Sequence, residues 1–163
     1  MDKNSRIPQK YRHDVHVALI AVAAVGPAGV FGDIDAIAVA GVWSGLVTAM
    51  LIDSGISLDK EAAKKLALAV ITGAGGYYAG CKLATKLFWL IPGGIFVGMG
   101  VSALANIMFT YRFAWVLALM LEEDRISQSN VLSIAGEIAK IMTTGGGLNL
   151  DGVKDIYALY RYD

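Results

Sequence analysis

The stretch Pro27-Ala28-Gly29-Val30-Phe31 decides the expected fold, because the chain repeats it as Pro92-Gly93-Gly94-Ile95-Phe96. Proline removes a backbone donor and disfavours helix in the residue before it, and glycine loosens the backbone. Each copy is therefore expected to break a helix and to form a hairpin tip with long apolar arms. The sequence predicts an all-α fold of two helical hairpins, related by a duplication, with amphipathic C-terminal helices. The expected tip residues are Pro27, Gly29, Pro92, Gly93 and Gly94.

The composition indicates a membrane protein. Of the 163 residues, 56% are hydrophobic and only 17% are charged, whereas ordinary globular domains carry about 25% charged residues. The formal net charge is zero, and a nucleic-acid partner is not expected because phosphate binding needs clustered basic charge. The one cysteine, Cys81, excludes an intramolecular disulfide and a metal site made of several cysteines.

Charge divides the chain into three expected parts. Residues 1–14 form a basic polar N-terminal tail, which the positive-inside rule places on the cytoplasmic side of a bilayer. Residues 15–121 form the double helical-hairpin membrane domain, and residues 122–163 form an amphipathic helical segment. If both tips lie on one side, the tail, the linker over residues 53–65 and the C-terminal segment share the other, aqueous side.

The arms are short for membrane spans. A hydrocarbon layer of ~30 Å needs ~20 apolar residues. The runs Val15–Phe31, Ala36–Ile52 and Ile95–Tyr111 contain no Asp, Glu, Lys or Arg and lie at the lower edge of that range. At about 1.5 Å per residue, the arm from Val15 to Pro27 reaches only ~18 Å. Two alternatives stay open: hairpins that cross the bilayer by tilting or thinning it, and hairpins wedged into one leaflet.

Local signals set helix ends outside the arms. Gly55 suits the residue after a helix C-terminus, and Ser57 or Asp59 can cap the next helix. Near the C-terminus, apolar residues at helical spacing predict an amphipathic helix lying on the bundle, on a partner or at the membrane surface. Those residues are Val131, Ile134, Ala135, Ile138, Ala139, Ile141 and Met142. Tyr11, Tyr157, Tyr160 and Tyr162 suit a membrane-interface belt.

Glycines four residues apart predict close helix packing. The pairs are Gly41 with Gly45, Gly76 with Gly80, and Gly94 with Gly98. Such faces let helix backbones approach closely in lipid, within one chain or between copies. The Gly-rich run over residues 73–80 lacks the strand before it and the spacing of a nucleotide-binding loop, so helix packing is preferred there.

Five charged residues interrupt the apolar region: Asp33, Asp35, Lys82, Lys86 and Arg112. Capping of a helix N-terminus explains the two aspartates, and contact of the cations with water or anionic headgroups explains the lysines and Arg112. The alternative is a polar or ion pathway, because charges at membrane depth are costly and usually functional.

No catalytic or metal site is expected. His13, Asp14 and His16 share a helix, but a third clear ligand is missing for a metal. No nucleophile, base and orienting group come together in the sequence pattern, so neither an enzyme nor a cofactor is expected.

The middle of the chain resembles a bacterial membrane domain, the YcjF-like family, which is also found appended to Era- or dynamin-type GTPases. The resemblance rests on the linker Ile56–Ala63, on Lys86-Leu87, on Leu90–Gly94 and on the small-residue arm to Thr110-Tyr111. It covers residues 33–121 and implies an all-helical membrane hairpin domain without catalysis. It also implies a bacterial inner membrane and a GTPase partner, although no GTPase precedes the domain here.

The expected function is that of a non-enzymatic integral membrane protein. It would self-associate and scaffold or shape a lipid bilayer, with both termini cytoplasmic. One alternative is an oligomeric pore or ion-conducting protein lined by the five charged residues. Another is a soluble helical protein that buries its apolar surface in a closed homo-oligomeric shell.

Overall fold

The chain forms an all-α bundle, as the sequence predicts. A computed structural model describes residues 6–27, 34–56, 59, 61–73, 90–127, 129–144 and 154, with no account of the side chains of residues 34–36 and 144. The short 3-10 helix η1 (Gln9–Tyr11) leads directly into α1 (Arg12–Val25). The next helices are α2 (Ile34–Ser54) and a helix over residues 61–73. The longest helix, α4 (Gly94–Glu122), is followed by α5 (Val131–Thr144), and the described residues contain no strand.

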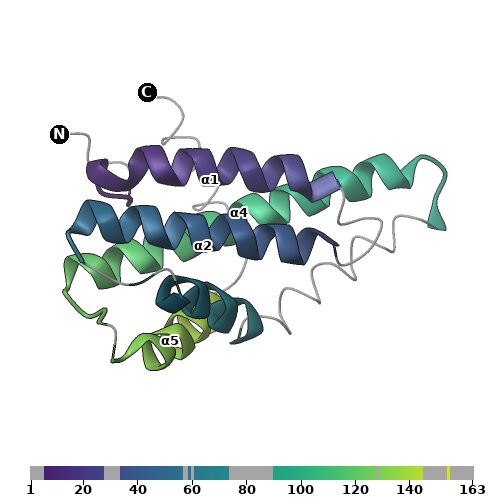
Figure 1. The fold of residues 1–163 in the computed structure, drawn as a ribbon. Helices are drawn as coiled ribbons and strands as arrows, with labels where there is room; N and C mark the ends of the chain where they lie inside the picture. The colour runs from purple at the N-terminus through teal and green to yellow at the C-terminus, as the bar shows by residue number, and fades with distance from the viewer. Residues whose placement is uncertain are drawn as a thin grey trace.

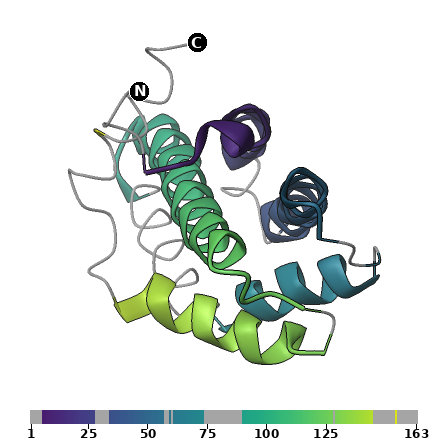
Figure 2. The same cartoon turned by 90° about the vertical axis from the view of Figure 1, so that its left-hand side faces the viewer.

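The helices form two layers. In Figure 1, α1, α2 and α4 lie side by side along the long axis, with α1 antiparallel to both α2 and α4. Figure 2 shows the helix over residues 61–73 beside α5, and both cross beneath α2 and α4. A Cβ added at Gly73 would lie 2.7 Å from that of Ala139, so these two crossing helices are in close contact. We call this pair the crossing layer.

Local chemistry explains where the helices begin and end. Asp59 caps the helix over residues 61–73, because its Oδ1 accepts a hydrogen bond from the Ala62 amide at 2.6 Å. Gly55 follows α2 with a φ of +76°, and the Ile56 amide donates to the Leu51 carbonyl, as in a Schellman cap. Both sequence predictions are confirmed. Asp124 makes the same cap after α4 with a φ of +51°, a conformation that glycine adopts more easily.

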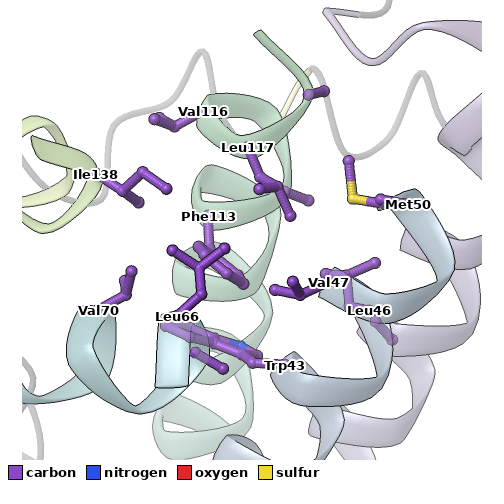
Figure 3. Close-up of a cluster of buried hydrophobic side chains, with 14 of the residues drawn as sticks. Trp43, Leu46, Val47, Met50, Leu66, Val70, Phe113, Val116, Leu117 and Ile138 are labelled. Atoms are coloured by element: carbon purple, nitrogen blue, oxygen red, sulfur yellow. The ribbon is translucent and has the colours of Figure 1, made fainter. Parts of the chain in front are cut away.

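The core lies where α2 and α4 meet the crossing layer. The indole of Trp43 stacks on the Phe113 ring, with 4.4 Å between centroids, and donates its N–H to Thr110 Oγ1 at 2.8 Å. Leu66 and Val70 from the helix over residues 61–73 complete this cluster, and Ile138 adds α5 (Figure 3). Each such side chain contributes about 1.5–3 kcal/mol when fully buried.

The amphipathic helix predicted near the C-terminus is confirmed as α5. Val131, Ile134, Ala135, Ile138, Ala139 and Met142 are buried, whereas Ser133 and Lys140 are exposed. Its apolar face lies on the bundle, which is one of the three positions that the sequence left open. Tyr11 is a correction: it is fully buried, because η1 packs into the core, and it does not lie in an exposed interface belt.

A close contact between α1 and α4 lies at a glycine outside the predicted pairs. A Cβ added at Gly26 would overlap the backbone of Ala103. Gly41 and Gly45 behave differently: both are exposed, and no atom of the described residues lies within 4 Å of an added Cβ at either position. Within the described part of the chain, α2 therefore does not use this glycine pair for packing.

We predict opposite effects for alanine at the two kinds of glycine. Gly26→Ala should lower the free energy of unfolding by roughly 1–3 kcal/mol, because α1 and α4 must separate to admit the methyl group. Gly45→Ala, the matched control, should raise it by about 0.5–1 kcal/mol, because alanine has the higher helix propensity. Thermal unfolding followed by circular dichroism measures both. Equal effects of the two substitutions would contradict the contact at Gly26.

Candidate functional site

Charged side chains gather at one end of the layer formed by α1, α2 and α4. Arg12 and Asp14 lie where α1 begins, Asp53 lies where α2 ends, and Glu122 lies where α4 ends. By sequence, residues 17–27, 36–52 and 90–111 contain no charged residue. Among the described side chains the bundle thus has a charged end and an end without charge, which we call the uncharged end; Asp35, in the first turn of α2, belongs to this end but its side chain is not described. The uncharged end is the candidate functional site.

The charged end is held together by the N-terminal segment. Lys10 Nζ lies 2.7 Å from Glu122 Oε1, and the Tyr11 hydroxyl donates to the same oxygen at 3.1 Å. The Arg6 guanidinium lies over the Trp115 ring at 5.0 Å, and Ile7 is fully buried. From Arg6 onward, the segment expected as a polar tail is therefore packed on α4. Lys10 holds the pKa of Glu122 below its ordinary value.

Two carboxylates meet between α1 and α2 at this end. Burial raises the pKa of Asp14, and the hydrogen bond and negative charge of Asp53 raise it further, whereas His13 lowers it. Asp53 also lies in the last turn of α2, where a negative charge opposes the helix dipole. This pair therefore works against folding at neutral pH, and it was missed in the sequence because its members are far apart along the chain.

The crossing layer carries its charges on the outside. Arg125, between α4 and α5, binds the Glu137 carboxylate through both oxygens at 2.6 and 2.7 Å. Glu61, Lys64 and Lys65 are exposed on the helix over residues 61–73. The crossing layer thus presents an ordinary water-compatible surface, unlike the uncharged end.

Large apolar side chains are exposed at the uncharged end. On α2 these include Ile37, which is 79% exposed, whereas the exposed Val17 and Ile20 lie along the first two thirds of α1, and Ile52 and Leu119 are exposed near the charged end. The largest group lies at and just after the second predicted tip, where Leu90 is 82% and Phe96 75% exposed, with Ile91, Val97 and Leu104 also exposed. In Figure 1 this tip extends past the end of α1. A surface of this kind marks a contact with a membrane or with another protein.

The described residues include two helical segments long and apolar enough to cross a membrane. Only 33% of the residues in Ile37–Ser54 of α2 are buried, compared with 72% in Gly94–Glu122 of α4. The difference shows that α4 is the central helix of the bundle, whereas most residues of α2 are not fully buried and one face of this helix points outward. Core helices of soluble proteins also pass such a length and composition test, so the outward face of α2 is the more informative feature.

Polar side chains inside the bundle continue the predicted glycine face of α4. Gly94 and Gly98 are buried, and Ser102, Asn106 and Thr110 follow at intervals of four residues, all buried. Asn106 Nδ2 donates a hydrogen bond to the Val22 carbonyl of α1 at 3.4 Å, and Thr110 Oγ1 accepts a hydrogen bond from the indole N–H of Trp43. This face therefore packs α4 against α1 and α2, and the spacing from Gly94 onward was the sequence signal for it.

The structure describes only some of the sequence-predicted site residues. Pro27 is half-buried just after α1, Pro92 and Gly93 are exposed, and Gly93 has a φ of +73°, as a tight turn requires. Asp35 lies in α2 without a described side chain. The predicted residues Gly29, Asp33, Gly76, Gly80, Lys82 and Lys86 lie outside the described residues.

Arg112 does not extend into the uncharged end. Its guanidinium donates to the Ile141 carbonyl at 2.8 Å, in the last turn of α5, where carbonyl groups lack helix partners. Arg112 therefore joins α4 to the crossing layer. The described residues contain no group of three or more His, Cys, Asp or Glu that could hold a metal ion.

Comparisons with protein-family models, with curated proteins and with solved structures find no match for this chain.

The carboxylate pair predicts a pH-dependent gain in stability for Asp53→Asn. At pH 7 the substitution removes the repulsion with Asp14 and a negative charge at the C-terminus of α2, and we expect roughly 0.5–1 kcal/mol of stabilisation. Because the pKa of Asp14 is raised in the folded state, the wild-type chain loses stability as pH rises from 3.8 through that raised value.

The gain should therefore shrink as pH falls toward 3.8, where the folded protein holds the proton that relieves the repulsion. Denaturant unfolding at a series of pH values measures it. The titration of Glu122 affects the stability of the wild-type chain and of Asp53→Asn equally. Because its pKa is lowered in the folded state, the ion pair with Lys10 stabilises both proteins above pH 4.5 and is lost in acid. A gain that is constant with pH would contradict the role of the pair.

Proposed function

We propose that this protein is a non-enzymatic membrane protein that self-associates and scaffolds or shapes a lipid bilayer. One observation carries the proposal: the uncharged end exposes large apolar side chains of α2 and α4, while the charged side chains described on α1 and α2 lie at the opposite end. Burial of apolar area in hydrocarbon is the favourable outcome for such a surface.

The lengths of the helices agree with this proposal. At about 1.5 Å per residue, α2 with its 21 residues is ~31 Å long and α4 with its 29 residues is ~43 Å long. The length of α2 matches a hydrocarbon layer of ~30 Å, and the length of α4 exceeds it, so that α4 also extends into the charged end. The 14 residues of α1 give only ~21 Å, so α1 reaches part of that depth.

The orientation follows from the cations. Lys10, Arg12, Lys64, Lys65 and Arg125 belong to the charged end or to the crossing layer. The positive-inside rule favours the cytoplasmic side for such clusters. We therefore propose that the charged end and both termini face the cytoplasm; the bacterial inner membrane is what the resemblance to the YcjF-like family implies. Self-association is supported by Gly41 and Gly45, whose outward face would let a second α2 approach closely.

Membrane extraction and vesicle remodelling test this proposal. Full-length protein expressed in bacteria should enter the membrane fraction, resist alkaline extraction and require detergent for release. Reconstituted into vesicles of phosphatidylethanolamine and phosphatidylglycerol, it should change vesicle shape in electron micrographs without releasing a trapped ion indicator.

Two results would contradict the proposal and favour one of the alternative functions. A soluble, lipid-free particle would support the closed protein shell, because the apolar surface would then be covered by other copies. Ion release that Asp33→Asn and Asp35→Asn abolish would support the pore. The double variant Gly41→Leu/Gly45→Leu tests self-association, because bulky side chains on this face of α2 should reduce the amount of crosslinked oligomer in detergent. The control Leu132→Ala, on the exposed side of α5, should leave the amount of oligomer unchanged.

A further inference from the structure

The second tip and the first turn of α4 form the most apolar exposed element of the described chain. Within residues 90–97, Leu90, Ile91, Phe96 and Val97 are all at least half exposed. This segment carries no charged or polar side chain. We call residues 90–97 the distal tip. A solvated loop or helix end of this length ordinarily carries turn and capping residues with polar side chains.

The backbone of the distal tip satisfies part of its own hydrogen bonding. Pro92 has no amide proton to satisfy. The Gly94 amide donates to the Ile91 carbonyl at 3.0 Å, and the Phe96 amide donates to the Gly93 carbonyl at 3.2 Å. No side chain caps the start of α4, whereas Asp59 caps the helix over residues 61–73 in the crossing layer. Such closure reduces the number of backbone donors that would lose water in hydrocarbon.

The distal tip extends beyond the end of α1. Gly26, just after α1, meets Ala103 of α4, nine residues beyond Gly94. At about 1.5 Å per residue, α4 continues ~14 Å past this contact. The helix α1 therefore ends ~14 Å short of the start of α4.

The charge on Arg112 sets a limit on how far the distal tip can reach. Arg112 is bound to the end of α5, in the layer whose other face carries water-exposed charges. From Gly94 to Tyr111, α4 has 18 uncharged residues, which give ~27 Å. This helical length falls short of the ~30 Å hydrocarbon layer by about 3 Å, residues 90–93 before it close in a turn through the Gly94 amide and the Ile91 carbonyl, and any tilt shortens the reach further.

We propose that the distal tip ends inside the hydrocarbon of the bilayer, as the deepest part of the protein, and does not emerge on the far side. The proposal rests on the proposed membrane function and specifies which element contacts lipid and from which side it enters. The crossing layer stays in water on the side of entry.

Depth-dependent quenching tests the position of the distal tip. In a full-length chain with Cys81→Ser, a cysteine at Phe96→Cys carries an environment-sensitive fluorophore. The matched control is Leu132→Cys, because Leu132 is an exposed large apolar residue too, at 68%, but belongs to the crossing layer. Both proteins are reconstituted into phosphatidylcholine and phosphatidylglycerol vesicles with brominated acyl chains, with iodide outside or trapped inside.

We expect the label at position 96 to be quenched several-fold more by brominated lipid than the label at position 132, and to resist iodide on both sides. Quenching at position 96 by iodide on either side would overturn the proposal while vesicle-bound protein keeps the membrane function intact. Protein that fails to float with the vesicles would overturn both. Protection of position 96 in a lipid-free particle would assign the distal tip to contacts between copies.

Charge substitution gives an independent measurement. Phe96→Asp should lower the bound fraction in vesicle flotation at least about tenfold, because a carboxylate in hydrocarbon is costly. Leu132→Asp should leave flotation unchanged and shows that one added carboxylate is tolerated elsewhere. Equal flotation of the two variants would overturn the proposal, provided that circular dichroism shows both to be helical.

Discussion

The helices α1, α2 and α4 contain almost no charged residues, so the apolar surface on all sides of each helix must be buried, and the rest of the structure follows from this constraint. A helix that is hydrophobic all round is stable only inside a large core or in a membrane. A chain of 163 residues can surround one such helix, and here that helix is α4. The crossing layer and η1 cover its C-terminal half, whereas α1, α2 and the start of α4 keep exposed apolar faces.

The polar groups within the bundle show how tightly this arrangement is set. The indole N–H of Trp43 would be costly to bury alone, and Thr110 supplies its acceptor across the α2–α4 contact. The stacking of Trp43 on Phe113 fixes the same contact from the apolar side. Register between α2 and α4 thus depends on one hydrogen bond and one ring pair in the same place. The contact at Gly26 fixes α1 against α4 by a different means, the absence of a side chain.

Features that depend on a few neighbouring residues could be predicted from the sequence. The cap at Asp59, the turn at Gly55 and the apolar face of α5 each follow from local chemistry or spacing. The orientation of small residues could not, because it depends on which helices meet. Gly41 and Gly45 have the packing spacing but face outward, whereas Gly26 has no glycine four residues away and yet contacts the backbone of Ala103 closely.

Long-range pairing of charges was equally hidden. Asp14 and Asp53, and likewise Lys10 and Glu122, come together only because α1 begins where α2 and α4 end. The same topology places Tyr11 inside the core, although a tyrosine beside a basic segment is typical of a membrane interface. Arg112 reads in the sequence as a charge at membrane depth, yet in the fold it caps α5.

The asymmetry of the two ends has a mechanical consequence on the proposed function. The crossing layer widens the half of the bundle nearer the charged end, and of the described helices only α4 continues to the distal tip (Figures 1 and 2). The cross-section in the bilayer would thus decrease with depth, because α1 stops at the level of Ala103 and α4 extends ~14 Å farther. A body that is wider near one surface expands that leaflet more than the other. Bending toward the opposite leaflet then relieves the difference, and self-association through the outward face of α2 would add the contributions of neighbouring copies.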